Sequence, residues 1–321
     1  MTNNRRRRAT TVATALLAGS AVAAVATRAR REHRRPRAMF PVLELTPSHR
    51  GGTGTPLLLL HGIGAIWRVW SPVLPHLEPH HDVIALTLPG HGGGPPLDPQ
   101  TAPSIQALTD RIEDDLDQLG LQQVHIAGNS LGGRIGIELA RRGRARSLVL
   151  FSPPGAWRSQ RSIELRATGV RLSLGALSRY ASRADAIAAN GVLRRSLLAG
   201  QVAHPDRVLP EALAASIRAG GLAPVVAALL REFPIQQVQP LPAIRDYPVR
   251  LVWAGQDRVL PFDGFGAPML ERLPGAELIH LHGVGHVPMS DDPAAVARLI
   301  LEVTNAVDHA AVSTEMGDHH A

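Results

Sequence analysis

The stretch Gly128-Asn129-Ser130-Leu131-Gly132-Gly133 decides how the rest of this sequence is interpreted. An apolar run, Val124-His125-Ile126-Ala127, precedes it, and a helix-like stretch follows at residues 134–140. A serine with glycines two positions before and after it, between a buried strand and a helix, is typical of a nucleophile elbow. The turn is so tight that only glycine leaves room around the strained serine. The alternative is a strand-to-helix turn whose glycines serve packing alone, so the motif needs partner residues elsewhere.

A second apolar run, at residues 57–60, leads into the glycine-containing loop His61-Gly62-Ile63-Gly64. Acyl transfer builds negative charge on an oxygen, and two pre-aimed backbone N–H groups stabilise that charge. We expect one N–H from Leu131, directly after the serine, and one from Ile63, with Gly62 allowing close approach and His61 bracing the loop by hydrogen bonds. A dinucleotide-binding fingerprint is the alternative, but its third glycine would fall at position 67, which is Trp67.

Two later segments supply partners for the serine: Gly255-Gln256-Asp257 and Gly285-His286-Val287-Pro288. Each lies just past a predicted strand, at the sheet edge where sites of open α/β sheets assemble. A serine hydroxyl needs a base with a pKa near neutrality, which histidine supplies, and the histidine needs a carboxylate to hold its tautomer. Asp257 and His286 therefore form a candidate triad with Ser130, in the chain order Ser…Asp…His.

Other residues near these segments remain alternatives for the same roles. His280 and His282 are further candidate bases, although one lies within a predicted strand and the other precedes a glycine turn. Asp263, Asp291 and Asp292 could form ion pairs or cap helices, and the last two look like an N-cap before Pro293.

From Phe40 onward short apolar runs alternate with amphipathic stretches, which is typical of a largely parallel sheet covered by helices. The predicted strands are 42–45, 57–60, 83–86, 124–127, 148–150, 249–253 and 277–281, and the predicted helices include 104–119, 131–142 and 293–307. Residues 155–240 break this alternation with several helices rich in Ala, Leu and Arg. We therefore predict an α/β core of residues 39–154 and 241–308, a helical cap of residues 155–240, and a disordered tail at 309–321.

The composition excludes several kinds of chemistry. The chain has 321 residues, no cysteine and no lysine, so disulfides, cysteine nucleophiles and lysine Schiff bases are absent. Its net charge of +7 comes from residues 1–38, which hold ten arginines and one glutamate. The remainder carries 24 basic and 26 acidic residues, so the charge gives no case for nucleic-acid binding.

The leader at residues 1–38 has an uncharged, alanine-rich stretch at 9–27 between two groups of arginines. A helix of that length just spans a bilayer at about 1.5 Å per residue. Three interpretations stay open: a weak signal anchor that associates with a membrane through residues 9–27, an unstructured leader before a start at Met39, and a cleaved signal peptide. The expected localisation is accordingly cytoplasmic or membrane-anchored.

Together with the elbow, the segments His61-Gly62, Leu88-Pro89-Gly90-His91-Gly92, Gly255-Gln256-Asp257 and Gly285-His286-Val287-Pro288 resemble the α/β-hydrolase superfamily. The resemblance covers residues 42–307. It implies a mostly parallel central sheet flanked by helices, a Ser–Asp–His triad, an oxyanion hole, a helical cap between the sixth and seventh strands, and neither cofactor nor metal.

The subfamily is less defined by this resemblance. Haloalkane dehalogenases and epoxide hydrolases carry aspartate at the elbow, and Ser130 argues against both. The Gly128-Asn129-Ser130 start is similar to that of carbon–carbon bond hydrolases of aromatic-ring cleavage, which usually have methionine and tryptophan where this chain has Leu131 and Val287.

The expected function is serine hydrolysis of a small or medium ester-like substrate, namely a carboxylic ester, thioester or lactone, through an acyl-enzyme. Gly62 and Trp67 are expected to contact the substrate, although Trp67 and Trp70 fit a helix core equally well. The alternatives are a ring-cleavage C–C bond hydrolase, a ligand-binding or signalling protein on the same scaffold, and a lyase or perhydrolase using the same triad. The partner expected is the small-molecule substrate, with no nucleic acid, and the sequence is silent on oligomeric state.

Overall fold

The computed structural model describes residue 40 and residues 43–318, with side chains as far as residue 311. The predicted leader, including the candidate membrane segment at residues 9–27, lies outside the described residues. Within them, no helix is both long enough and apolar enough to cross a bilayer.

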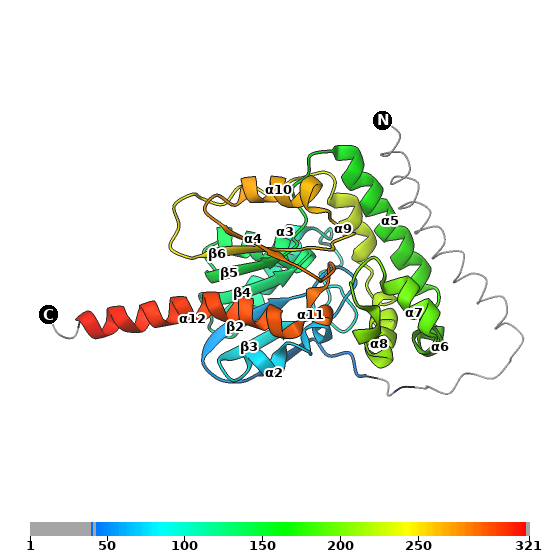
Figure 1. Ribbon diagram of the computed structural model, residues 1–321, viewed down its shortest axis with the longest axis horizontal. Helices are drawn as coiled ribbons and strands as arrows, with labels where there is room; N and C mark the ends of the chain where they lie inside the picture. Colours follow the sequence, from blue (N-terminus) through cyan, green and yellow to red (C-terminus); the bar gives the residue numbers. More distant parts are fainter. Residues whose placement is uncertain (1–39, 41–42, 319–321) are drawn as a thin grey trace, which may run out of the picture.

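A seven-stranded sheet forms the centre of the molecule, in the spatial order β1-β3-β2-β4-β5-β6-β7 (Figure 1). β1 runs antiparallel to β3, and the other neighbouring strands are parallel. The strands are β1 (Ser48–Gly51), β2 (Thr55–Leu60), β3 (His81–Leu86), β4 (Val124–Asn129), β5 (Ala145–Phe151), β6 (Val249–Ala254) and β7 (Glu277–Leu281). This mostly parallel sheet confirms the predicted fold class.

The leucines of β2 explain why the strand reads as an unbroken apolar run. Leu58 and Leu60 belong to the apolar cluster on one face of the sheet, and Leu57 and Leu59 belong to the cluster on the other face. All four side chains are fully buried. A parallel strand covered on both faces needs apolar residues at every position, because successive side chains point to opposite faces.

Helices cover both faces of the sheet. The helices of one face are α3 (Ile105–Gln118), α4 (Leu131–Arg141) and α10 (Phe262–Arg272), and those of the other are η2 (Trp67–Trp70), α2 (Leu74–Leu77), α11 (Pro288–Asp291) and α12 (Pro293–Asp318). α3 begins where the sequence predicted, because the Ser104 hydroxyl caps it by accepting a hydrogen bond from the Ala107 N–H.

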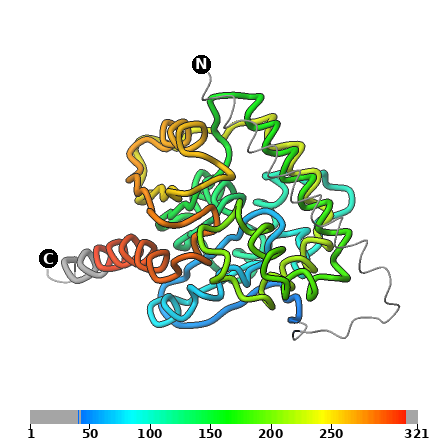
Figure 2. Tube along the Cα trace, turned by 45° about the vertical axis from the view of Figure 1, so that its right-hand side comes forward, coloured from blue at the N-terminus to red at the C-terminus, as the bar shows by residue number. Residues whose placement is uncertain are grey.

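A helical cap lies at one end of the sheet, at the right of Figure 1, and its green to yellow-green segments stay together in Figure 2. Its helices are α5 (Gln160–Ser178), η3 (Ala181–Arg183), α6 (Ala184–Ala189), α7 (Gly191–Leu198), η4 (Pro205–Arg207), α8 (Pro210–Gly220) and α9 (Val226–Glu232). The two chain ends of the cap meet, because the Val238 N–H donates to the Gly155 carbonyl at 2.7 Å.

Three details of the predicted organisation are wrong. Residues 43–45 of the predicted first strand are not a strand, and β1 at Ser48–Gly51 takes that place. The resemblance implied a cap between a sixth and a seventh strand, whereas residues 155–240 lie between the fifth and the sixth described strands, β5 and β6, where the predicted strand ranges also place them. The last helix continues to Asp318, so residues 309–318 extend α12 where a disordered tail was predicted. Alanines at 306, 310 and 311 favour that continuation.

Candidate active site

Ser130 occupies a strained turn between β4 and α4. Its φ of 52° is one that residues with a side chain rarely adopt, and its side chain is buried. The turn is held by a hydrogen bond from the Ser130 N–H to the Phe151 carbonyl at 2.9 Å. α4 begins at the next residue, so the first N–H groups of a helix lie beside the serine, where negative charge is favoured.

The glycines around Ser130 are required by close backbone contacts. A Cβ at Gly132 would lie 2.2 Å from the Leu60 carbonyl oxygen, and a Cβ at Gly128 would lie 2.5 Å from the Gly132 carbonyl oxygen. Real Cβ atoms essentially never approach so closely, and both obstacles are backbone atoms that cannot turn aside. The tight turn therefore requires glycine at positions 128 and 132, as the spacing in the sequence predicted.

The loop after β2 lies against the elbow. A Cβ at Gly62 would lie 3.3 Å from the Ser130 Cβ, so Gly62 and the serine are neighbours. His61 braces this loop, as predicted: its Nε2 accepts a hydrogen bond from the Leu88 N–H at 2.9 Å, and its Nδ1 donates to the Gly62 carbonyl at 2.7 Å. Burial lowers the pKa of His61 to about 3, which keeps this imidazole neutral and able to accept at Nε2.

Asp257 and His286 form a buried pair. Asp257 follows β6, and its Oδ2 lies 2.7 Å from the Nδ1 of His286, which follows β7. The other carboxylate oxygen of Asp257 accepts hydrogen bonds from the N–H groups of Val259 at 2.9 Å and Leu260 at 2.7 Å. Because both oxygens are engaged, the carboxylate is fixed in one orientation towards the imidazole.

Asn129 connects this pair to the elbow. Its side-chain amide donates to the His286 carbonyl at 2.9 Å and to the Phe151 carbonyl at 3.2 Å. The structure thus brings Ser130, Gly62, Asp257 and His286 to the same edge of the sheet. The Ser130 hydroxyl itself makes no hydrogen bond with the described residues, so its exchange of a proton with His286 is part of the proposal below.

Trp67 packs against the core at the start of η2. Its side chain is 7 % exposed and belongs to the apolar cluster under η2 and α12, as does Trp70. Its indole N–H donates to the Thr46 hydroxyl at 2.9 Å, and its ring stacks on His49. These contacts hold the indole against the core and favour the core interpretation, and a substrate-binding role for Trp67 stays a prediction.

The cap closes over this edge of the sheet through several glycines. A Cβ at Gly64 would meet Leu174 of α5 at 3.2 Å, and a Cβ at Gly285 would meet the Val202 backbone at 2.7 Å. The cap loop is anchored by Asp291, whose carboxylate accepts hydrogen bonds from the N–H groups of Ala203, His204 and Gly285. The sequence suggested a helix N-cap for Asp291 or Asp292, and Asp292 has that role, with its Oδ1 accepting from the Ala295 N–H at 3.0 Å.

Arg134 is a second residue whose position the sequence did not indicate. It lies one helical turn after Ser130 on α4, is buried, and donates from Nη2 to the Gln236 carbonyl at the end of the cap at 2.7 Å. Its guanidinium also lies over the Phe233 ring, 5.6 Å from the centroid. No local signal could have identified Arg134 or Asp291, because their partners lie about 80 to 100 residues away.

Histidines and carboxylates of the described residues do not gather anywhere into a group of three or more that could hold a metal ion. The residues of the candidate site lie in the elbow after β4 and in the loops after β2, β6 and β7.

Comparisons with known proteins show the family of this chain. The sequence profile of the Alpha/beta hydrolase family matches residues 57–299, and the chain belongs to that family. A curated relative, the epoxide hydrolase EphH of Mycobacterium tuberculosis, is 32% identical over 61% of this chain and 93% of its own length. The putative carbamate hydrolase RutD of Pseudomonas savastanoi is 32% identical over 78% of this chain and 94% of its own.

Solved structures show the same fold. A thermophilic esterase from Thermogutta terrifontis superposes with a TM-score of 0.64 at 23% identity, over 81% of this chain and 93% of that one. A putative lipase from Acinetobacter baumannii gives a TM-score of 0.65 at 22% identity, over 83% and 91% of the two chains. The relatives support hydrolase activity as the general class for this chain.

Proposed function

We propose that the protein is a serine hydrolase that cleaves small or medium carboxylic esters, thioesters or lactones through an acyl-enzyme on Ser130. The observation that carries the proposal is the 2.7 Å pairing of His286 Nδ1 with Asp257, tied through Asn129 to a serine at a strained elbow. A buried serine with positive φ, a paired imidazole and a doubly anchored carboxylate form a costly arrangement that packing alone does not require.

The pairing assigns the protons. An ionised carboxylate only accepts hydrogen bonds, so the Nδ1 of His286 carries the proton that faces Asp257. In the neutral imidazole the Nε2 is then the free base. We infer that this nitrogen removes the Ser130 proton while the serine oxygen attacks the substrate carbonyl, and that Asp257 stabilises the imidazolium that results.

The remaining steps follow from the same groups. The tetrahedral oxyanion is held by the N–H groups of Leu131 and Ile63, one at the start of α4 and one in the loop braced by His61. The imidazolium of His286 gives its proton to the departing alcohol or thiol, which leaves the acyl group on Ser130. Water, deprotonated by His286, then attacks the acyl carbonyl and releases the acid, restoring the serine hydroxyl.

Ser130 also bears on the choice among the family's activities. The relative from Mycobacterium tuberculosis is named an epoxide hydrolase, and the resemblance associates that chemistry with an aspartate at the elbow, whereas this chain has serine. A hydroxyl nucleophile suits acyl transfer, because the acyl-serine ester is hydrolysed by the same base that formed it. We therefore propose ester-like substrates rather than epoxides.

The test is the Ser130→Ala variant, assayed with short p-nitrophenyl esters and with a fluorophosphonate probe. We expect turnover to fall by at least about 10³-fold and labelling to disappear, because both need the serine oxygen. The matched control is Ser216→Ala, which removes an exposed hydroxyl on α8 and should leave both unchanged. Retained turnover and labelling in Ser130→Ala would refute the assignment, and a ligand bound but never cleaved by the wild type would favour a binding protein.

A further inference from the structure

The cap and the core carry opposite charges. Residues 155–240 contain eleven arginines and five carboxylates, a net charge of +6 with histidine neutral. The rest of the chain after residue 38 contains 13 basic and 21 acidic residues, a net charge of −8. A molecule divided in this way turns its basic side towards an anionic surface.

The outer side of α5 concentrates apolar and basic side chains on one stripe. Arg161, Leu165, Leu172 and Arg179 follow one another at intervals of four, seven and seven residues, which places them on one side of a helix. We call these four residues the α5 face. Leu165 and Leu172 are 61% and 65% exposed, and α5 lies on the outer side of the cap (Figure 1). The face is therefore an exposed leucine pair between two arginines.

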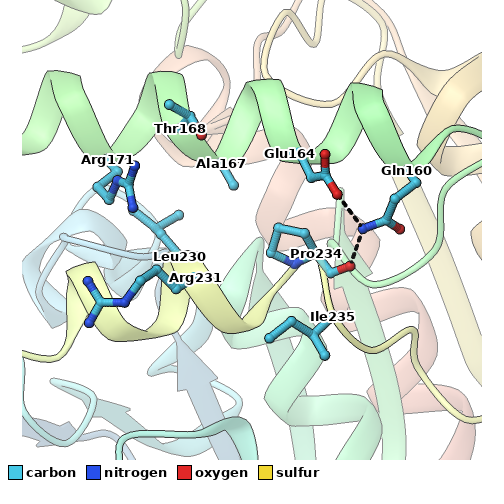
Figure 3. A pocket seen from close by; sticks show the side chains of 9 residues that line it. All are labelled: Gln160, Glu164, Ala167, Thr168, Arg171, Leu230, Arg231, Pro234 and Ile235. Atoms are coloured by element: carbon cyan, nitrogen blue, oxygen red, sulfur yellow. Dashed lines mark hydrogen bonds between the residues drawn. The ribbon is translucent and has the colours of Figure 1, made fainter.

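A groove runs beside the α5 face, between α5 and α9, with a volume of about 410 Å³ (Figure 3). Arg171 and Arg231 lie together at one end of the groove, next to Leu230. At the other end Gln160 donates hydrogen bonds to Glu164 and to the Pro234 carbonyl. The groove thus offers a guanidinium group from each of its two sides at one end and, at its other end, a carboxylate that is already hydrogen-bonded. None of its lining residues belongs to the candidate active site.

Four arginines on or beside the α5 face form no ion pair within the part of the chain that the structure describes. No carboxylate there pairs with Arg161, Arg171, Arg179 or Arg231. Other cap arginines are paired: Arg195 with Asp206 and Arg218 with Asp185. Four free guanidinium groups beside two exposed leucines match the composition of a surface that rests on anionic lipid, with apolar side chains below the phosphates and cations level with them.

We propose that the cap docks on an anionic lipid bilayer through the α5 face, with Arg171 and Arg231 taking a lipid phosphate into the groove. Each arginine near such a surface adds attraction, and the leucines add apolar burial. The opposite side of α5 touches the candidate site, since Leu174 packs against Gly64 and Arg166 donates to the Val259 carbonyl at 2.7 Å. Docking would therefore bring the side of the candidate active site that α5 covers close to the bilayer. The proposal does not depend on hydrolysis by Ser130.

The absence of cysteine makes a site-specific test direct. The full-length Leu172→Cys variant is labelled with a nitrobenzoxadiazole fluorophore and mixed with vesicles of phosphatidylcholine alone or of phosphatidylcholine with phosphatidylglycerol. We expect stronger, blue-shifted emission only with the anionic vesicles, because the label enters an apolar layer. The control is Ile244→Cys, which is 94% exposed just before β6 begins, at the edge of the sheet away from the cap.

Charge variants in the labelled Leu172→Cys chain test the arginines. Arg161→Gln and Arg179→Gln should each weaken vesicle partitioning about fivefold, and added salt should weaken it further. Arg298→Gln removes the same charge outside the cap, on α12, and should have little effect.

Three results would overturn the proposal. Equal emission changes at positions 172 and 244 would mean that the chain is held near vesicles without docking through α5. An unchanged emission at position 172 while the chain is bound to vesicles would also mean that the chain does not dock through α5. A response of the label to inorganic phosphate alone would show that the groove serves a soluble anion instead.

Discussion

The side-chain amide of Asn129 donates a hydrogen bond to the backbone carbonyl of His286 across 2.9 Å. Asn129 is the residue before Ser130, so this contact fixes the loop of the candidate base relative to the elbow of the candidate nucleophile. The same amide also donates to the Phe151 carbonyl, and the side chain is almost completely buried. A single amide therefore fixes the distance between the turn after β4 and the loop after β7, two strands that lie on either side of β5 and β6.

Replacing Asn129 by aspartate should reduce activity while the protein stays folded. A carboxylate has the same shape but cannot donate, so the His286 carbonyl loses its partner, at a cost of about 1–3 kcal/mol in the free energy of unfolding, while the Phe151 carbonyl keeps the Ser130 N–H. We expect kcat for p-nitrophenyl esters to fall by about 10- to 100-fold with a smaller change in KM, because the loop of His286 is displaced. Asn190→Asp is the matched control, since Asn190 only accepts hydrogen bonds, at the start of α7. Equal losses in the two variants would contradict this account.

The Asp257→Asn variant tests the proton assignment of His286. The asparagine oxygen can still accept from the N–H groups of Val259 and Leu260, so the loop should keep its shape. The amide then faces Nδ1 with a donor and favours the wrong tautomer of the imidazole. We expect kcat to fall by about 10⁴-fold with little change in melting temperature.

The control for this charge removal is Asp263→Asn, on the first turn of α10 outside the site. Steady-state ester hydrolysis and thermal unfolding of both variants measure the two predicted quantities, kcat and the melting temperature. If Asp257→Asn kept more than a tenth of the wild-type kcat, the carboxylate would not be the partner that orients His286.

Arg134 should act as a latch between the core and the cap. Burial lowers the pKa of Arg134 to about 10, so the guanidinium remains protonated at neutral pH, and burial raises the pKa of the neighbouring Glu232. Arg134→Met removes the hydrogen bond to the Gln236 carbonyl and the nearby positive charge that acts on Glu232, and should lower the free energy of unfolding by about 1–3 kcal/mol. A looser cap should raise KM more than it lowers kcat.

The double variant Arg134→Met/Glu232→Gln separates the latch from simple packing. It should recover part of the lost stability, because no buried charge is left alone. Arg141→Met, on the same helix but at the surface, should cost no more than about 1 kcal/mol. Additive effects of the Arg134 and Glu232 changes, measured by urea unfolding, would rule out the coupling.

His91 should make the protein less stable in acid. Burial lowers its pKa from 6.5 to about 4, and its Nε2 has no hydrogen-bond partner among the described residues. Between those two pH values the unfolded chain binds a proton that the folded chain does not, so stability falls as the pH drops through this window. His91→Phe removes this proton and should reduce the slope of unfolding free energy against pH by about 1.4 kcal/mol per pH unit. Urea unfolding at several values between pH 7 and pH 4.5 measures the slope, and an unchanged slope would contradict the assignment.

The sheet could be predicted from the sequence where strands are buried on both faces. β6 (Val249–Ala254) is buried along its whole length and contains the predicted run at 249–253, and the run at 57–60 lies within β2. β1 was missed because it is an antiparallel edge strand of sequence SHRG, whose side chains are half-buried or exposed. An edge strand of this kind has no apolar pattern for the sequence to display.

Those residues of the candidate site that lie in local sequence motifs could be predicted from the sequence. The glycines around Ser130, Gly62 and the loops bearing Asp257 and His286 all carry such motifs, and the structure brings them to one edge. Trp67 could not be assigned from the sequence, because a tryptophan at the start of a helix suits a pocket or a core equally, and its contact with Thr46 favours the core. Asp291 and Arg134 act through partners distant in the chain, which no local pattern encodes.

The hydrogen bond between Val238 and Gly155 closes the cap at its base. The two ends of residues 155–240 meet there. The segment therefore leaves and rejoins the core at one place, as a short loop would, whatever its length or content. A relative could exchange the whole segment for a shorter, longer or differently shaped one without moving β5 or β6. Grafting the cap of another family member between Gly155 and Val238 is thus a way to transfer substrate preference while the elbow and its partners stay untouched.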